Sequence, residues 1–249
     1  MTDIPEDHPR YRSLLTRELL VKGVKDGITS MQGLIAQGRG EAFDYLLGER
    51  TTPSAESAEK AAVAMMLLAK KPVISVNGNA AALVAAGLCQ LSKAVDAPLE
   101  VNLFHRTEER VAKIVERLES NGAATIYGDK PDRLIPGLSH DRAKASSNGI
   151  FAADVVLVPL EDGDRCDALV KMGKKVIVVD LNPLSRSART ATVTIVDNIV
   201  RAVPSMTAMA LEMKSMSAST LEKIVREYDN EKALEEALDA MMDNVKNAK

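Results

Sequence analysis

Polar and charged residues follow five of the six apolar, β-branched runs of this sequence, at the point where each run ends. The residues are Asn77 and Asn79, then Asn102, His105 and Arg106, then Asp164 and Arg165, then Asp180 and Asn182, then Asp197 and Asn198. The carboxyl ends of parallel strands meet at one edge of a sheet, where ligands bind, so we expect these side chains to line a common pocket. Amides, carboxylates and guanidinium groups together suit a small anionic ligand.

Arg39 stands between two glycines, Gly38 and Gly40, directly before a segment that we expect to be helical over 41–47. Backbone N–H groups beside a guanidinium would let a phosphate approach there. A plain turn is the alternative, and it is the more common use of two glycines at this spacing. The sequence contains neither a Walker-type phosphate loop nor the glycine fingerprint of dinucleotide-binding folds, so no standard motif identifies a nucleotide site.

The six runs predict the strands of a sheet. They cover residues 72–76, 99–104, 123–127, 154–158, 175–179 and 192–196, and most are nearly continuous valine and isoleucine. Such runs are typical of parallel strands that are buried on both faces. Helix-patterned segments lie between them, so strand and helix alternate along the chain. We therefore expect an α/β fold with an open, doubly wound, mostly parallel (Rossmann-like) sheet of about six strands, with helical attachments at both termini.

We expect three parts within one structural domain. Residues 1–52 would form an N-terminal helical and glycine-rich segment, residues 53–215 the core, and residues 216–249 a set of C-terminal helices. The longest connection without clear structure covers residues 128–153, which makes a functional loop plausible there.

Local signals place several helix ends. Thr52 would be the N-cap of a long helix that reaches Lys70, and Gly48 would end the helix before it. Ser219 and Glu222 form a capping box that would open the first C-terminal helix. A further helix is expected over 11–25.

Composition excludes several classes of protein. The chain has 249 residues, a formal net charge of −3, and 3% aromatic residues without tryptophan. A cationic surface or a base-stacking platform for nucleic acid is therefore not expected. The longest apolar run, 61–69, is too short to span a membrane, and the polar N-terminal segment is unlike a secretory signal. Cys89 and Cys166 lack metal-ligand spacing, so we expect a cytoplasmic protein with two thiols and no protein metal site.

Seven motifs together are distinctive. They are HPRY at 8–11, GLIAQGRGEAFDY at 33–45, VISVNGN at 73–79, EVNLF at 100–104, VLVPLEDGDR at 156–165, DLNPLSRS at 180–187 and TIVDNI at 194–199. With them the sequence resembles the archaeal phosphopantothenate synthetases, also called 4-phosphopantoate–β-alanine ligases, from His8 to about Tyr228. The resemblance implies a cytosolic homodimer of coenzyme A biosynthesis that condenses 4-phosphopantoate with β-alanine, consumes ATP and releases AMP and pyrophosphate.

The resemblance also implies which residues hold ATP: Arg17, Arg39, Asp180, Leu181, Asn182, Arg186, Ser187, Asn198 and Ile199. Mg²⁺ is expected to come with ATP and to be coordinated mainly by phosphates and water.

The residue types agree with such a role. A carboxylate that attacks the α-phosphorus of ATP needs fixed cations nearby, and Arg39 and Arg186 suit that task. Arg106 and Arg165 are our candidates for the phosphate of the second substrate. Asn77, Asn79 and Asn102 are neutral groups that could orient its oxygens.

The acidic run from Glu161 to Asp164 has two interpretations of equal weight. Glu161, Asp162 or Asp164 would take the proton of the β-alanine amine, or Asp164 would cap the helix that follows.

Two other functions remain open on the residues alone. One is a nucleotide-binding regulatory module without catalysis, which would bind ATP but form no AMP. The other is an NAD(P)-linked reductase, which the missing glycine fingerprint disfavours.

Overall fold

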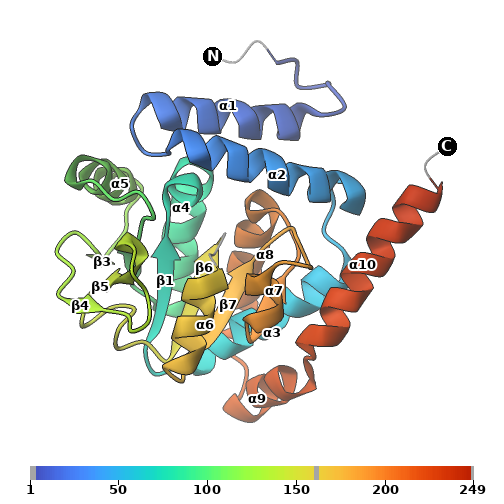
Figure 1. The fold of residues 1–249 in the computed structure, drawn as a ribbon. Coiled ribbons are helices and arrows are strands. Elements are labelled where there is room, and N and C mark those ends of the chain that lie inside the picture. Colours follow the sequence, from blue (N-terminus) through green and yellow to red (C-terminus); the bar gives the residue numbers. More distant parts are fainter. Residues whose placement is uncertain (1–3, 160–162, 248–249) are drawn as a thin grey trace.

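The computed structural model describes residues 4–159 and 163–247, and a parallel sheet lies at its centre (Figure 1). The strand order is β3-β2-β1-β6-β7-β8, and all five neighbouring pairs are parallel. The strands are β1 (Pro72–Val76), β2 (Leu99–Val101), β3 (Ile126–Tyr127), β6 (Val155–Pro159), β7 (Lys175–Val179) and β8 (Val193–Ile195). The predicted α/β fold and its parallel, doubly wound sheet are confirmed.

Three strands are shorter than their apolar runs, and the run 192–196 loses one residue at each end to form β8. The run 99–104 forms strand only to Val101, because Val101 pairs with Val76, the last residue of β1. Beyond that pair the neighbouring strand has ended, and only one further bond, from the Asn102 amide to the Val76 carbonyl, continues the ladder. The run 123–127 forms strand only at Ile126 and Tyr127.

The strands are placed on both sides of β1, so the strand order of the sheet reverses between β1 and β6. The chain runs outward from β1 to β3, then returns to place β6 on the other side of β1 and continues to β8. Such a reversal leaves a crevice beyond the carboxyl ends of the two central strands, because the following connections diverge to opposite sides.

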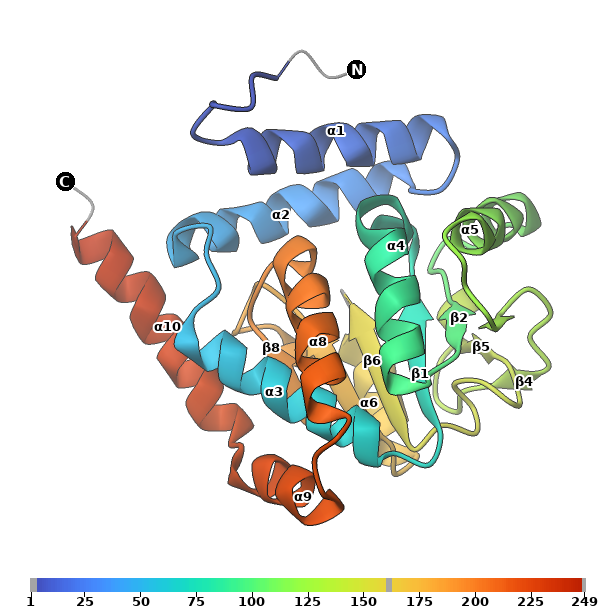
Figure 2. The ribbon, with the colours of Figure 1, turned by 180° about the vertical axis from the view of Figure 1, so that it is seen from behind.

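The two faces of the sheet are covered differently. Val155 and Leu157 of β6 belong to the larger core, which α3 (Pro53–Leu68), α4 (Gly78–Val95), α5 (Glu108–Ser120) and α8 (Ile199–Met213) share. Figure 2 shows α3, α4 and α8 over this face. Val156 and Val158 point the other way, into a smaller core with α6 (Gly163–Lys171). This alternation is the period-two pattern of a buried strand.

The segment 128–153 takes the place of a helix beside α6. It contains β4 (Arg133–Leu134), a short 3₁₀ turn (Asp141–Ala143) and β5 (Lys144–Ala145), and β4 pairs with β5 antiparallel. Ile135, Ala145 and Ile150 are buried in the smaller core, so this segment closes the sheet face that α6 leaves uncovered.

Two helices cross above the carboxyl ends of the strands, α1 (Tyr11–Lys25) and α2 (Met31–Leu47) (Figure 1). Both interpretations of the backbone at Gly38-Arg39-Gly40 are wrong, the plain turn and the phosphate-binding stretch before a helix that starts at residue 41, because all three residues lie inside α2. Ser30 caps this helix by accepting the amide of Gly33 at 3.2 Å, and Gly48 ends it with a left-handed φ of 83°. The cap at Ser30 and the apolar face of the helix outweigh the low helix propensity of its three glycines.

Gly38 gives a direct test of this helix. A Cβ atom added there meets no heavy atom within 4 Å, and the residue is exposed. We expect Gly38→Ala to stabilise the protein by about 0.8–1 kcal/mol, because alanine lowers the entropy cost of helix formation. The melting temperature should rise by roughly 2–4 °C in differential scanning calorimetry. A lower melting temperature would show that residue 38 is not helical.

The first C-terminal helix begins earlier in the chain than the predicted capping box at Ser219 and Glu222 indicated. Helix α9 (Ala218–Glu227) is capped by Ser217, whose hydroxyl oxygen accepts the amide of Thr220 at 3.2 Å, so Ser219 lies inside the helix. The final helix is α10 (Asn230–Asn247), which packs against α2 and α3. Among the residues described, none of the helices has the length and apolar character needed to cross a membrane.

Candidate active site

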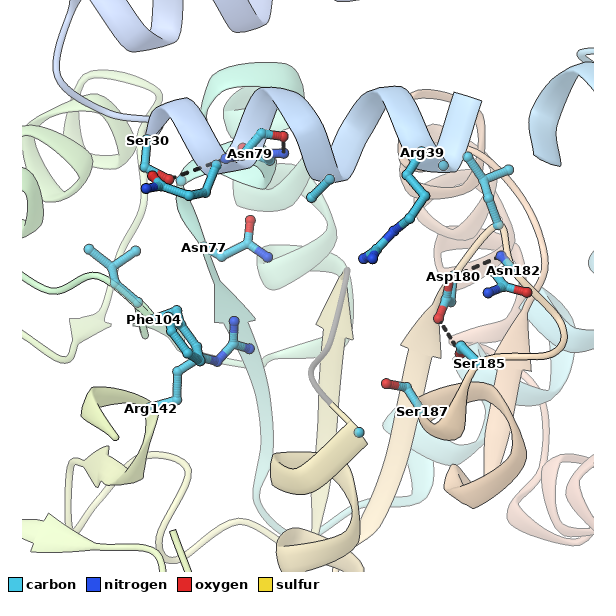
Figure 3. Close-up of a pocket in the computed structure, with 18 of the residues that line it drawn as sticks. Ser30, Arg39, Asn77, Asn79, Phe104, Arg142, Asp180, Asn182, Ser185 and Ser187 are labelled. Atoms are coloured by element: carbon cyan, nitrogen blue, oxygen red, sulfur yellow. Dashed lines mark hydrogen bonds between the residues drawn. The ribbon is translucent and has the colours of Figure 1, made fainter. Parts of the chain in front are cut away.

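A cleft of about 660 Å³ lies beneath α2, at the topological switch point between β1 and β6 (Figure 3). Segments that follow β1, β2, β6 and β7 form its walls. Of its lining residues within 4–159 and 163–247, four are arginines, Arg39, Arg110, Arg142 and Arg186, whereas one is a carboxylate, Asp180. Such an excess of positive charge in a concave site favours an anionic ligand.

Asp180 organises the loop that follows β7. Its carboxylate accepts the Ser185 hydroxyl at 2.5 Å and the backbone amide of Asn182 at 3.0 Å. Burial raises the pKa of Asp180, while the bonds to Ser185 and Asn182 and the charge of Arg39 act in the opposite direction. The loop is thus held rigidly with Asp180 and Leu181 facing the cleft.

Arg39 and Arg186 reach the same end of the cleft from different elements. Arg39 descends from α2 into the space between Asn77 and Asp180 in Figure 3. Arg186 forms an ion pair with Asp164 at 2.7 Å, and both side chains are exposed. Asp164 lies in the first turn of α6, so the interpretation of Asp164 as the N-cap is wrong.

Gly163 makes the approach between α6 and Arg186 possible. A Cβ atom at this position would lie 2.7 Å from the Cβ atom of Arg186. A larger residue there would push Arg186 away from the cleft, since the collision involves the fixed base of its side chain.

Two asparagines after β1 shape the cleft. The amide oxygen of Asn77 caps α4 by accepting the Ala80 amide at 2.9 Å, and its nitrogen donates to the Pro159 carbonyl at 2.8 Å. Asn79 donates to the Gly33 carbonyl at 2.9 Å and so ties α4 to α2. Both residues line the cleft, as the sequence predicted, and their amides also position its walls.

The opposite end of the cleft is built from the loop after β2 and from the segment 128–153. Phe104 lies between two imidazole rings, edge-on to His105 and stacked on His140, with both ring centroids 5.0 Å away. Arg142 lines the cleft although only 4% of its surface is exposed. Arg110 donates to the backbone carbonyls of His105 and Ile28 and thereby secures the loop.

Asn102 and Arg106 lie outside the lining of this cleft. The Asn102 side chain is 1% exposed and donates to the carbonyls of Arg142, at 3.3 Å, and Lys144, at 2.9 Å. Arg106 donates to the carbonyls of Gly128 and Asp129 at 2.6 and 3.0 Å. Both residues thus fasten the segment 128–153, and neither is brought to the cleft itself.

Four further residues suggested by the sequence lie elsewhere. Arg17 pairs with Glu41 at 3.1 Å, and Glu41 lines a second cavity rather than the cleft. Asn198 caps α8, donates to Asp44 at 2.8 Å and lines this second cavity, which has a volume of about 310 Å³.

The other two residues are buried. Ile199 lies in the large core, and the fully buried Arg165 donates to the Ser75 hydroxyl at 3.1 Å. Glu161 and Asp162 lie outside the described residues.

The sequence singled out neither Arg142 nor Arg110 as a residue of the site. Neither follows a strand directly, which was the signal used to find the others. The signal available for Arg142 was the length of the connection 128–153, since long ordered loops in compact domains often carry functional residues.

Fold and site together define an α/β protein of Rossmann-like topology, with an arginine-rich cleft at the switch point of its sheet. The chain belongs to the phosphopantothenate/pantothenate synthetase family, whose model matches residues 54–244.

Relatives with assigned names share most of the chain. A 4-phosphopantoate–β-alanine ligase of Methanosarcina mazei is 58% identical over 99% of this chain and 97% of its own length. The enzyme of the same name from Thermococcus kodakarensis is 60% identical over 96% of this chain and 92% of its own. That from Methanospirillum hungatei is 55% identical over 84% of this chain and 86% of its own.

Proposed function

We propose that this protein is an ATP-dependent 4-phosphopantoate–β-alanine ligase that acts in the cytoplasm, in coenzyme A biosynthesis. The observation that carries the proposal is one cleft with arginines at both ends, in a chain that aligns almost end to end with relatives of that name. Joining ATP to a phosphorylated acid requires a site that accepts two polyanions at once.

The nucleotide would occupy the end of the cleft that follows β7. Six of the residues implied by the resemblance meet there: Arg39, Asp180, Leu181, Asn182, Arg186 and Ser187. A carboxylate at a strand end can accept ribose hydroxyls, and Leu181 offers apolar contact for the base. Arg39 and Arg186 would face the phosphates.

A magnesium ion would enter the cleft together with ATP. In the part of the chain that the structure describes, no three His, Cys, Asp or Glu side chains are grouped to hold a metal. Mg²⁺ binds readily through phosphate oxygens and water, and in that form it would offset phosphate charge.

The reaction would proceed in two displacements. A carboxylate oxygen of 4-phosphopantoate bonds to the α-phosphorus of ATP, and the bond from that phosphorus to pyrophosphate breaks. The amine of β-alanine then bonds to the acyl carbon, AMP leaves, and the amine loses a proton. Both nucleophiles belong to substrates, so the protein supplies positioning and charge. Asp164, beside Arg186, is the described candidate for the proton acceptor.

The proposal is tested by incubating the protein with ATP, Mg²⁺, 4-phosphopantoate and β-alanine and separating the products by chromatography. AMP and 4′-phosphopantothenate should form in equal amounts and depend on both acid and amine. ADP with phosphate would exclude the adenylate route. Saturable ATP binding without any product would instead indicate a regulatory module.

We also propose that the protein is a homodimer, as the resemblance implies. A groove of about 900 Å³ between α1, α4 and α8 carries apolar side chains such as Leu15, Leu19, Leu83 and Pro204. A second copy of the chain would remove this surface from water. Light scattering should give twice the 26.8 kDa mass of one chain.

A further inference from the structure

The end of the cleft opposite Asp180 contains Arg142, a cation that the sequence did not single out. We propose that Arg142 binds the phosphate group of the acid substrate, and that three residues on and after β2 hold it in position. This inference rests on the proposed ligase function and assigns the part of the cleft that selects a phosphorylated acid.

Arg142 is placed for such a contact. Its side chain is 4% exposed yet lines the cleft, and in Figure 3 it points up beside Phe104 toward Asn77. Arg110, the other arginine at this end, donates to the carbonyls of Ile28 and His105 and so braces the loop. A largely desolvated guanidinium binds phosphate more strongly than an exposed one, because water screens it less.

The shape of the acid decides which end receives its phosphate. The carboxylate must meet the α-phosphorus of ATP, and the nucleotide end is marked by Arg39 and Asp180. The phosphate sits at the other end of the four-carbon chain and therefore points toward Arg142. At the Arg142 end, Leu103 and Phe104 offer an apolar wall to the dimethyl carbon of the acid, which is bonded to the carbon that bears the phosphate. The positive end of the α4 dipole, at Gly78, faces the same space.

Glu100 of β2 and Asn102, which directly follows the strand, fasten the segment that carries Arg142. Glu100 is fully buried and accepts the amides of Ser146, at 2.9 Å, and Ile150, at 2.6 Å. Asn102, two residues later on the same strand face, holds the carbonyl of Arg142 itself. Since side chains two apart in a strand point the same way, both reach this segment.

Arg106 completes the attachment by binding the first residues of the segment, Gly128 and Asp129. The segment is thus held at its start, near its middle and toward its end. Arg106 and Asn102, which the sequence suggested for the substrate itself, would act through Arg142 as positioning residues.

The test is a comparison of Michaelis constants in the purified full-length protein. For Arg142→Ala we expect the KM for 4-phosphopantoate to rise about ten- to a hundredfold, the loss of a charged hydrogen bond. The KM for ATP should stay within about twofold. The preference for 4-phosphopantoate over unphosphorylated pantoate should shrink by a similar factor, and Arg142→Lys should restore part of it. Arg133→Ala, an exposed arginine of the same segment, is the matched control and should change neither constant.

The outcomes separate the two proposals. A wild-type protein that forms no AMP with 4-phosphopantoate and β-alanine would overturn the ligase function and this inference with it. An active wild type whose Arg142→Ala and Arg142→Lys variants keep the normal KM and the normal preference would overturn the inference alone. Equal losses for ATP and for the acid would also overturn it, because they would indicate a general structural defect.

Asn102→Ala tests the positioning role. Removal of its amide should raise the KM for 4-phosphopantoate several-fold and leave that for ATP unchanged, since the two carbonyls it binds belong to Arg142 and Lys144. A loss of thermal stability with both constants unchanged would show that Asn102 supports only the fold, and the positioning claim would fall.

Discussion

Replacement of Arg39 by alanine is expected to lower kcat/KM by about a hundred- to a thousandfold, the usual cost of removing one preorganised charge from a transition state. Arg39 points from α2 into the cleft, and its charge opposes the rise of the Asp180 pKa, so the two groups share one electrostatic environment. Negative charge builds between the attacking carboxylate and the α-phosphorus, and a guanidinium there offsets the repulsion. The measurement is initial-rate AMP formation with both ATP and acid varied.

Arg50→Ala is the matched control for this substitution, because Arg50 is exposed just beyond the C-terminal end of α2 and does not line the cleft. It should retain wild-type kcat/KM. Arg39→Lys should recover only part of the loss, since an ammonium cannot bind two phosphate oxygens in the planar arrangement of a guanidinium. Activity of Arg39→Ala within threefold of wild type would remove Arg39 from the site.

Replacement of Glu59 by glutamine should stabilise the protein at alkaline pH and flatten its pH dependence. Glu59 is fully buried in α3, where the Ser205 hydroxyl donates to Oε2 at 2.5 Å. Burial, with a smaller contribution from the charge of Asp197 and against the opposing effect of the Ser205 hydrogen bond, raises the pKa of Glu59 from 4.5 to about 8. The folded protein therefore keeps Glu59 protonated at neutral pH, whereas the unfolded chain has it ionised.

The sign of the change in unfolding free energy with pH follows from the number of protons that each state binds. Between pH 4.5 and pH 8 the folded state holds one more proton at Glu59, so wild-type stability falls as pH rises through this range. The slope is at most about 1.4 kcal/mol per pH unit. Glutamine has no proton to lose, so the free energy of unfolding of Glu59→Gln should exceed that of wild type increasingly from pH 5 to pH 8.

Urea denaturation at several pH values measures the effect. Glu222→Gln is the control, because Glu222 is exposed on α9, away from Glu59, and its replacement should leave the wild-type slope in place. If Glu59→Gln showed the same pH dependence as wild type, the buried carboxyl would titrate normally and its assignment as a neutral acid would be wrong.

The location of the cleft could be predicted from the chain because strand ends are a local property. Continuous valine and isoleucine mark β7, and the residue that follows it, Asp180, then lies at the carboxyl edge. Parallel pairing brings all such edges to one side, so Asn77 and Asp180 face the same cleft although about a hundred residues separate them.

The conformation around Arg39 was misjudged for a physical reason. Two glycines lower helix propensity and favour a turn. Ser30 and Gly48 nevertheless cap a continuous helix, which packs on α4 and α10. Packing of a helix face contributes more than the propensity of individual residues, and it cannot be read from three adjacent letters.

The position of Arg142 in the cleft could not be predicted from local sequence patterns. Arg142 lies in an irregular segment, and its position over the cleft depends on bonds from Asn102, which is forty residues earlier in the chain. The sequence suggested Asn102 for the substrate itself, whereas the structure places its amide on the carbonyls of Arg142 and Lys144. This partnership was not identifiable, because hydrogen bonds between distant segments leave no periodic signal.

The sequence by itself determined the parallel α/β sheet, the family and the edge of the sheet at which the cleft lies, because hydrophobic periodicity, strand-end polarity and long motifs are all carried by neighbouring residues. Tertiary structure alone decided which polar groups line the cleft and which support it. In the folded chain Arg165 and Asn102 are buried, Arg17 pairs with Glu41, and Arg142 lines the cleft from a loop. These placements depend on which distant segments pack together, and a side chain takes its role from the partner it meets there.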